Sequence, residues 1–250
     1  FSSARAAALL ENEAAQETLI ASVLAQADAR GYAGVDVDFE YLGAELAAVY
    51  ASFLGRLRDA LHAQGLPLLA ALAPKTARDQ TGTLYEGHDY AAVAQSTDAV
   101  LLMTYEWGYT YGPPMAVAPL PSVRRVVEFA LTEMDAAHIF LGFPNYGYDW
   151  TLPYTPGTTR ARSLGSEEAV RLAADCGAEI RYDEASQTPW FPYTDSAGQA
   201  HEVWFEDVRS SRAKFALAAE YGLRGFGYWN FMRPFTANFC LLNALFRLDD

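Results

Sequence analysis

Residues 31–41 read Gly-Tyr-Ala-Gly-Val-Asp-Val-Asp-Phe-Glu-Tyr, and the predicted fold follows from this segment. Asp36, Asp38 and Glu40 stand at every second position. In a β-strand such residues share one face, so the three carboxylates point the same way and the apolar residues between them point to the other side. Burying three acids costs free energy unless they share protons or find partners, which makes a role in chemistry the first hypothesis.

Two other interpretations of this strand stay open. A strand with one charged face is also typical of a solvated sheet edge, and three aligned carboxylates are also typical of a divalent-cation site. The flanking sequence favours a buried strand, because helix-like residues 3–30 precede it and an amphipathic segment over 46–61 follows it. Such an alternation predicts a crossover connection and a parallel sheet.

Composition limits the possible functions. The chain has 250 residues, of which 51% are hydrophobic, and this is enough for one large α/β domain or two small ones. Its net charge of −13 disfavours nucleic acid and anionic membrane surfaces as partners. Its apolar runs fall short of the ~18 residues of a membrane span. The two cysteines and four histidines show no ligand spacing, so we expect no metal and no other cofactor; we expect both cysteines to be packed thiols.

Hydrophobic periodicity predicts an alternation of strands and helices along the chain. Strands are expected at 34–39, 66–73, 99–105, 138–143 and 225–229, with helices at 3–30, 46–61, 122–136, 166–175, 208–221 and 237–247. Residues 106–121 and 144–159 are expected to be long aromatic loops, and residues 177–207 a hairpin insertion before the last strand.

The fold class expected from this order is α/β, a (β/α)8 TIM barrel of which the chain holds about strand 4 to strand 8. Polar and aromatic residues follow the ends of the strands, where barrels carry their chemistry. Residues 1–250 are expected to form a single catalytic domain that lacks its N-terminal strands, since the sequence begins without Met and without a secretory signal pattern.

Residues 33–40, Ala-Gly-Val-Asp-Val-Asp-Phe-Glu, resemble the motif Asp-Gly-x-Asp-x-Asp-x-Glu of the family 18 glycoside hydrolases, the chitinase-like enzymes. The last three acids match, and Ala33 replaces the first. Met103-Thr104-Tyr105-Glu106 is similar to the family's Met-x-Tyr-Asp, and Tyr228-Trp229 to its eighth-strand Trp. Agreement at three strand ends in the right order is far more specific than any one motif.

The chain is most similar to the cell-wall branch of that family, the spore cortex-lytic N-acetylglucosaminidases. Five segments carry this likeness: 71–76, 85–90, 103–108, 144–150 and 203–207. The resemblance implies a GlcNAc-containing polysaccharide, peptidoglycan or chitin, as substrate. It also implies an extracellular, cell-wall or spore-associated location, and peptidoglycan-binding modules outside this chain.

The resemblance implies substrate-assisted catalysis, in which the substrate's own acetamido oxygen attacks the anomeric carbon. Glu40 would then be the general acid, Asp38 would orient the acetamido group, and Asp36 would support Asp38. Tyr105 would bind the acetamido oxygen, and Ala33 would alter the buried proton network. The expected substrate-binding residues are Glu106, Trp107, Asn145, Tyr146, Tyr148 and Trp229.

The leading hypothesis is therefore a retaining glycosidase that cleaves β-N-acetylglucosaminyl linkages in peptidoglycan of the spore cortex. A chitinase or chito-oligosaccharide hydrolase would use the same residues. A hypothesis from another class is a non-catalytic, chitinase-like carbohydrate-binding protein. Such relatives typically lose the terminal Glu of the motif, whereas Glu40 is retained here.

Overall fold

The computed structural model describes residues 2–246, which divide into two compact units. Unit 1 comprises residues up to Met103, Arg125–Leu141 and Gly222–Phe226. Unit 2 comprises Thr104–Arg124, Gly142–Tyr221 and the segment from Gly227 onward. Each unit is described by itself below.

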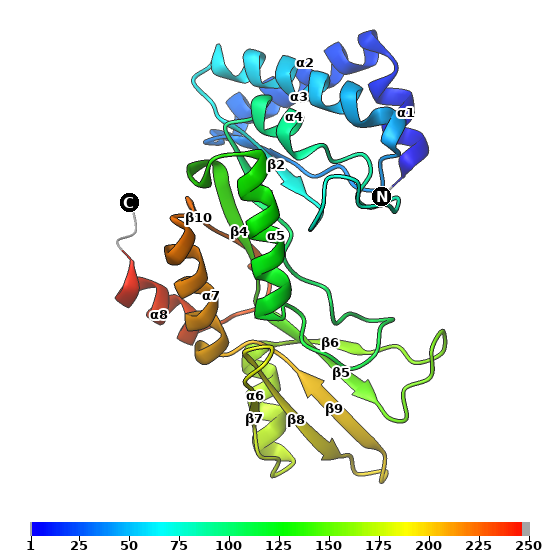
Figure 1. Cartoon of the computed structure of the whole chain (residues 1–250), viewed down its shortest axis with the longest axis vertical. Coiled ribbons are helices and arrows are strands. Elements are labelled where there is room, and N and C mark those ends of the chain that lie inside the picture. Colours follow the sequence, from blue (N-terminus) through cyan, green and yellow to red (C-terminus); the bar gives the residue numbers. More distant parts are fainter. Residues whose placement is uncertain (1, 247–250) are drawn as a thin grey trace. The chain divides into compact units, whose positions relative to one another are not determined.

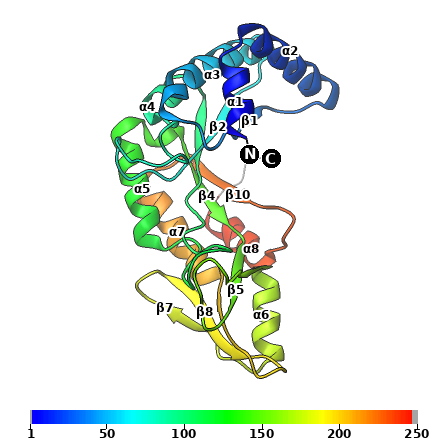
Figure 2. The same cartoon turned by 90° about the vertical axis from the view of Figure 1, so that its right-hand side faces the viewer.

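Unit 1 is built on parallel strands in which β1 pairs with β2, β2 with β3 and β3 with β4. The sheet order is β1-β2-β3-β4-β10, and β4 and β10 begin in unit 1 and end in unit 2. Figures 1 and 2 show α2, α3 and α4 grouped along one side of β1 and β2. The elements are α1 (Ser3–Leu10), α2 (Glu13–Arg30), β1 (Val35–Val37), η1 (Ala44–Leu46), α3 (Ala47–His62), β2 (Leu68–Leu72), α4 (Tyr90–Gln95), β3 (Ala99–Leu102), α5 (Leu120–Glu133), η2 (Ala136–His138), β4 (Ile139–Pro144) and β10 (Gly225–Trp229).

The core of unit 1 follows from the apolar face of α3. Its buried residues recur at helical spacing, at Tyr50, Phe53, Leu54, Leu57 and Leu61. This face packs against β2, whose residues are nearly all buried, as expected for a strand inside a parallel sheet.

Unit 2 contains a second, antiparallel sheet in the order β6-β5-β9-β8-β7. Helix α6 packs on one face of it, over a core that includes Leu164, Phe191 and Phe205 (Figure 1). The opposite face carries Tyr146, Tyr148 and Trp150. The elements are β5 (Tyr146–Thr151), β6 (Arg162–Gly165), α6 (Ser166–Asp175), β7 (Arg181–Asp183), β8 (Thr188–Thr194), β9 (Ala200–Trp204), α7 (Val208–Tyr221) and α8 (Thr236–Leu245).

A buried ion pair joins the middle of α7 to the segment that precedes this helix in unit 2. Lys214 donates from Nζ to both carboxylate oxygens of Glu206, at 3.0 and 2.8 Å. Both residues are almost fully buried, at 1% and 0% exposure. Burial removes both charges from water, and each charge is compensated only by its partner.

Three sequence predictions need correction. The helix over 3–30 is two helices, because the side chain of Asn12 accepts a hydrogen bond from the Ala15 amide and starts α2. The segment 144–159 is not all loop, since β5 occupies Tyr146–Thr151. Cys176 and Cys240 are exposed rather than packed.

Replacement of Lys214 by Met tests the buried ion pair. We expect Lys214→Met to lower the free energy of unfolding by about 3–5 kcal/mol, because it leaves the Glu206 carboxylate buried without a counter-charge. Adding Glu206→Gln removes that charge and should restore part of the loss. Denaturant unfolding of the three proteins measures both steps; a double variant as unstable as Lys214→Met would contradict this account.

Candidate active site

The acid segment begins in β1 and continues beyond it. Asp36 lies in β1, and Asp38 and Glu40 follow its carboxyl end. Val37 is buried, and Phe39 stacks on Tyr50 with ring centroids 5.7 Å apart. The two apolar side chains are thus anchored in the core of unit 1, which leaves the alternating acids on the other side of the backbone.

The carboxyl groups of Asp36 and Asp38 share a raised affinity for protons. Both residues are exposed as a whole, yet partial burial of the carboxyl groups raises the pKa of each. The negative charge of Asp38 raises the pKa of Asp36 further.

Glu40 is half-buried and lines a hollow of ≈ 330 Å³ in unit 1. Asp38 and Phe39 line the same hollow, together with Arg5, Ala6 and Leu9 of α1. The hydroxyl of Ser3 donates to the carbonyl oxygen of Tyr41 at 2.7 Å and so ties α1 to the residue after Glu40. Tyr41 has a φ of 58°, a left-handed conformation that turns the chain directly after the acid.

His88 connects the segment of Glu40 to the end of β2. It is fully buried; its Nε2 lies 2.8 Å from the Phe39 carbonyl oxygen, and its Nδ1 accepts the Ala73 amide at 2.9 Å. The amide can donate only to an unprotonated Nδ1, so the imidazole is neutral and Nε2 carries the proton donated to Phe39. Burial accordingly lowers the pKa of His88 to about 4.

Lys75 and Tyr90 complete this buried clamp. Lys75 donates from Nζ to the His88 carbonyl oxygen at 3.1 Å, and burial lowers the pKa of Lys75. Tyr90 donates to the Ala73 carbonyl oxygen at 2.6 Å and accepts from the Lys75 amide at 3.1 Å. The clamp formed by these three residues was not predicted; its signal in the sequence is the polar residues within the segments 71–76 and 85–90.

In unit 2, Glu106 accepts hydrogen bonds from two tyrosines. Tyr146 and Tyr148 donate to its Oε1 at 3.1 and 2.9 Å. Burial, and then the charge of Glu106, raises the pKa of both phenols, so both stay protonated donors. Glu106 has a φ of 66°, which shows that this turn is held by its surroundings against an unfavourable backbone conformation.

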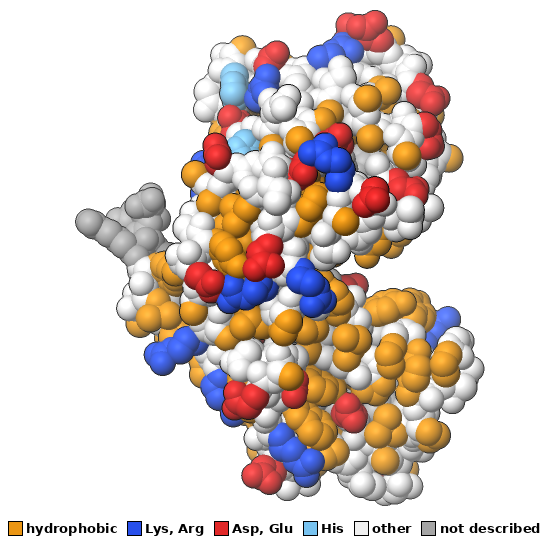
Figure 3. Space-filling model, viewed as in Figure 1, with side chains coloured by type: hydrophobic (Ala, Val, Ile, Leu, Met, Phe, Trp, Pro, Cys, Tyr) orange, Lys and Arg blue, Asp and Glu red, His pale blue; other side chains and the backbone are white. Residues whose placement is uncertain are grey.

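The other expected site residues of unit 2 differ in accessibility. Tyr105 is half-buried against the aromatic cluster of β5, and Trp107 is half-buried with its amide bonded to the Val117 carbonyl oxygen. Trp229 is 52% exposed at the end of β10. Hydrophobic side chains gather over the loops beside β5 and β6 on the face drawn in Figure 3. Tyr109 and Tyr111, in the loop that follows Trp107, are both exposed.

Asn145 is buried and binds backbone only. Its Nδ2 donates to the carbonyl oxygens of Asn230 and Arg233 at 2.6 and 2.9 Å, and its Oδ1 accepts the Asn230 amide at 2.8 Å. These bonds use both donors of the amide, so Asn145 holds the segment that follows Trp229.

The structure thus brings Glu106, Tyr146 and Tyr148 into direct contact in unit 2, and places Asp36, Asp38 and Glu40 along one segment in unit 1. Within residues 2–246, no group of three or more His, Cys, Asp or Glu residues has a geometry suited to a metal ion. In the same residues, the helices are all too short or too polar to cross a membrane.

Comparison with known proteins places the chain among carbohydrate-active enzymes. Residues 3–233 match the sequence profile "Glycosyl hydrolases family 18". The chain is 46% identical over 240 residues to the "Cortical fragment-lytic enzyme" of Bacillus subtilis (strain 168), covering 96% of this chain and 56% of that protein. The chain therefore spans about half the length of this curated relative.

Solved structures give the same result. The spore cortex-lytic enzyme SleL of Bacillus megaterium QM B1551 has a TM-score of 0.95 and 41% identity, over 99% of this chain and 57% of that one. A chitinase from Chromobacterium violaceum has a TM-score of 0.86 and 28% identity, over 94% of this chain and 73% of that one.

The His88 clamp predicts a specific dependence of stability on pH. His88 is neutral in the folded state, so its contribution is complete above the unfolded pKa of 6.5 and is lost as the pH falls toward about 4. The slope is at most about 1.4 kcal/mol per pH unit. His88→Gln can make the same two hydrogen bonds without titrating, so its unfolding free energy should lack this slope. Parallel curves for the two proteins between pH 4 and 8 would contradict the assignment.

Proposed function

Because the chain belongs to glycosyl hydrolases family 18, we propose that it is a retaining glycosidase that cleaves β-N-acetylglucosaminyl linkages of peptidoglycan, in the spore cortex. Membership of the family confirms the resemblance seen in residues 33–40. It also confirms the fold class, since the half-barrel sheet is a partial (β/α)8 barrel like those of the solved family members. The names of the cortex-lytic relatives support the choice of substrate and the location at the spore cortex.

One observation carries this proposal. Glu40 lines the hollow beyond β1 together with Asp38, and the neighbouring carboxyls of Asp36 and Asp38 have raised pKa values. A glycosidase of this family needs one protein acid, because the acetamido group of the substrate supplies the nucleophile. The arrangement supports Glu40 as that acid.

The proposed reaction has two steps. In the first, Glu40 protonates the leaving glycosidic oxygen while the acetamido oxygen bonds to the anomeric carbon, giving an oxazolinium intermediate. Asp38 accepts a hydrogen bond from the acetamido N–H and stabilises the positive charge. In the second, Glu40 takes a proton from a water molecule, whose oxygen bonds to the anomeric carbon. The bond between that carbon and the acetamido oxygen breaks, which opens the oxazolinium ring and gives a product of retained configuration.

Asp36 and Asp38 are proposed to share one proton during this cycle. Two adjacent carboxyls cannot both ionise without repulsion, and the raised pKa of Asp36 already includes that effect from Asp38. When Asp38 becomes fully charged beside the cationic intermediate, Asp36 can hold the proton. Ala33 removes one further acid from this network relative to the family motif.

The residues of unit 2 are proposed to bind the sugar. Tyr105 donates to the acetamido oxygen and holds it for attack, and Trp229 offers an exposed aromatic face to the apolar side of the ring. Glu106, fixed by its two tyrosines, accepts hydrogen bonds from sugar hydroxyls. Trp107 is proposed to extend the binding surface, and Asn145 to hold the segment that follows Trp229.

Chitin oligomers are the second candidate substrate, favoured by the likeness to the Chromobacterium violaceum chitinase. They contain the same acetamido nucleophile and need the same acid. Parallel digestion of purified cortex and of chitin oligomers by the full-length protein, with identification of the new reducing ends, separates the two. Release of N-acetylglucosamine ends from chitin but not from cortex would contradict the peptidoglycan assignment.

Glu40→Gln tests the assignment of the acid. We expect kcat on cortex fragments to fall by at least about 10²-fold, because the amide cannot donate the proton, while binding of the glycan survives since the shape is nearly unchanged. Turnover and equilibrium binding measure the two effects. Full activity of Glu40→Gln would exclude Glu40 as the general acid.

A further inference from the structure

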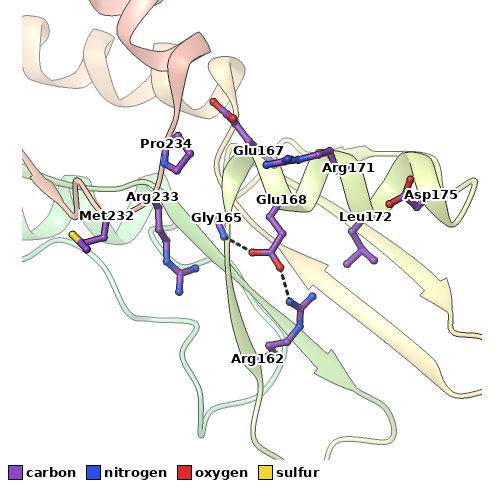
Figure 4. Close-up of a pocket in the computed structure, with 10 residues that line it drawn as sticks. All are labelled: Arg162, Gly165, Glu167, Glu168, Arg171, Leu172, Asp175, Met232, Arg233 and Pro234. Atoms are coloured by element: carbon purple, nitrogen blue, oxygen red, sulfur yellow. Dashed lines mark hydrogen bonds and ion pairs between the residues drawn. The ribbon is translucent and has the colours of Figure 1, made fainter.

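A second hollow, of ≈ 660 Å³, lies in unit 2 between α6, the end of β6 and the segment that follows β10 (Figure 4). Its three arginines are offset by three acids that line the same hollow, and one of these arginines, Arg162, pairs with Glu168 at 2.6 Å. Positive charge in this hollow is therefore compensated within the chain. Arg160, two residues before Arg162, lies in a different environment.

Arg160 is the one charged residue of two neighbouring loops in unit 2, residues 107–119 and 152–161. The rest of these loops is uncharged, in a chain whose net charge is −13. Arg160 is exposed, and no acid among residues 2–246 forms an ion pair with it. Its guanidinium lies over the ring of Tyr111, 5.4 Å from the ring centroid. A guanidinium held against an aromatic face points its N–H groups outward in its own plane, where they fit a carboxylate.

The first of these loops presents two tyrosine rings on a fixed backbone. Tyr109 and Tyr111 are 40% and 54% exposed, and their rings lie edge to face with centroids 6.1 Å apart. Three successive carbonyl oxygens, those of residues 110–112, accept hydrogen bonds from the Ala161 amide at 2.8 Å, the Tyr154 hydroxyl at 3.0 Å and the Trp150 Nε1 at 2.7 Å. A ligand that binds these tyrosines therefore orders little additional backbone, which lowers the entropic cost of binding. We refer to Tyr109, Tyr111 and Arg160 as the tyrosine–arginine surface.

The tyrosine–arginine surface adjoins the proposed sugar-binding residues through Tyr148. Tyr148 donates to Glu106 at 2.9 Å, and burial, followed by the charge of Glu106, raises the pKa of the Tyr148 hydroxyl. A hydrogen bond with the side chain of Thr110 acts on this pKa in the opposite direction. Thr110 lies between Tyr109 and Tyr111 in the chain, so one hydroxyl group contacts both Glu106 and the loop that carries the two tyrosines. A substrate bound at Glu106 is therefore placed to extend onto the surface.

We propose that the tyrosine–arginine surface binds the peptide substituent of a muramyl residue, an acidic peptide, and so favours peptidoglycan over chitin. This rests on the proposed function. The lactyl carboxyl of such a residue is consumed in the amide bond to the peptide, but the peptide brings a free carboxylate at its own C-terminus. Arg160 can bind that carboxylate with two parallel hydrogen bonds, and the tyrosine rings can pack on the apolar parts of the peptide. A glycan without peptide offers no acceptor of this kind to Arg160.

The test is equilibrium binding to the full-length protein with Glu40→Gln, so that binding is measured without hydrolysis. The probes are the GlcNAc–MurNAc disaccharide carrying a tetrapeptide with free carboxylates, the same compound with amidated carboxylates, the peptide-free disaccharide as its lactyl amide, and chitobiose. We expect Arg160→Met to weaken binding of the free-carboxylate probe by about 3- to 10-fold and of the other three by less than about twofold. This loss should shrink as salt is added, because the ion pair is exposed to solvent.

Two further variants separate peptide binding from other effects. Tyr111→Ala should weaken binding of both peptide-bearing probes and change binding of the peptide-free disaccharide and of chitobiose by less than about twofold. Arg181→Met is the matched control, since Arg181 is also exposed in unit 2 and lies over an aromatic ring, that of Trp190, at 5.2 Å. It should change binding of none of the four probes.

The proposal is overturned if Arg160→Met weakens binding of all four probes equally, if it leaves the free-carboxylate probe unchanged, or if Arg181→Met has the same effect. A loss for chitobiose after Tyr111→Ala as large as the loss for the tetrapeptide probes would also overturn it, because the surface would then bind sugar rather than peptide. The substituted side chains are exposed, so all three variants are expected to fold. Because binding is measured without catalysis, failure of the hydrolase assignment would appear separately, as inactivity of the unmodified protein on cortex.

Discussion

The packing of Val37 and Phe39 into unit 1 is the constraint on which the acid site depends. Side chains alternate along an extended segment. Because Val37 is buried and Phe39 stacks on Tyr50, the three acids of the segment lie on the other side. A shift of the register by one residue would bury three carboxylates and expose two core residues. The hydrophobic effect therefore positions the acids, and partial burial, followed by the negative charge of Asp38, raises the pKa of Asp36.

Buried polar side chains complete this positioning in both units. His88 links the Phe39 carbonyl oxygen to the Ala73 amide, and Asn145 holds the backbone that follows Trp229. Each uses a fixed set of donors and acceptors, so each permits few alternative arrangements of the backbone that carries the expected functional residues. Side-chain hydrogen bonds thus hold the backbone just beyond the strand ends, where the ladder of strand pairing stops.

The sequence allowed the α/β order, the family and the direction of the acids to be predicted, because alternating apolar and acidic residues report burial directly. It also located α6 and α7 within their observed bounds. It did not reveal β5, because Gly147 and Asp149 alternate with the aromatic residues, a composition typical of loops. It also did not reveal that Asn12 caps the start of a separate helix, α2. The contacts of His88, Lys75 and Arg233 depend on residues distant in the chain, which periodicity cannot identify.

The central claim is that the acetamido group of the substrate is the nucleophile and that Glu40 is the acid that assists it. The most direct measurement is kcat of the full-length protein on aryl β-glycosides whose N-acetyl group carries zero, one, two or three fluorine atoms. Fluorine withdraws electron density from the attacking oxygen. This account predicts that kcat falls steeply with each added fluorine; a kcat that is independent of fluorine content would contradict it.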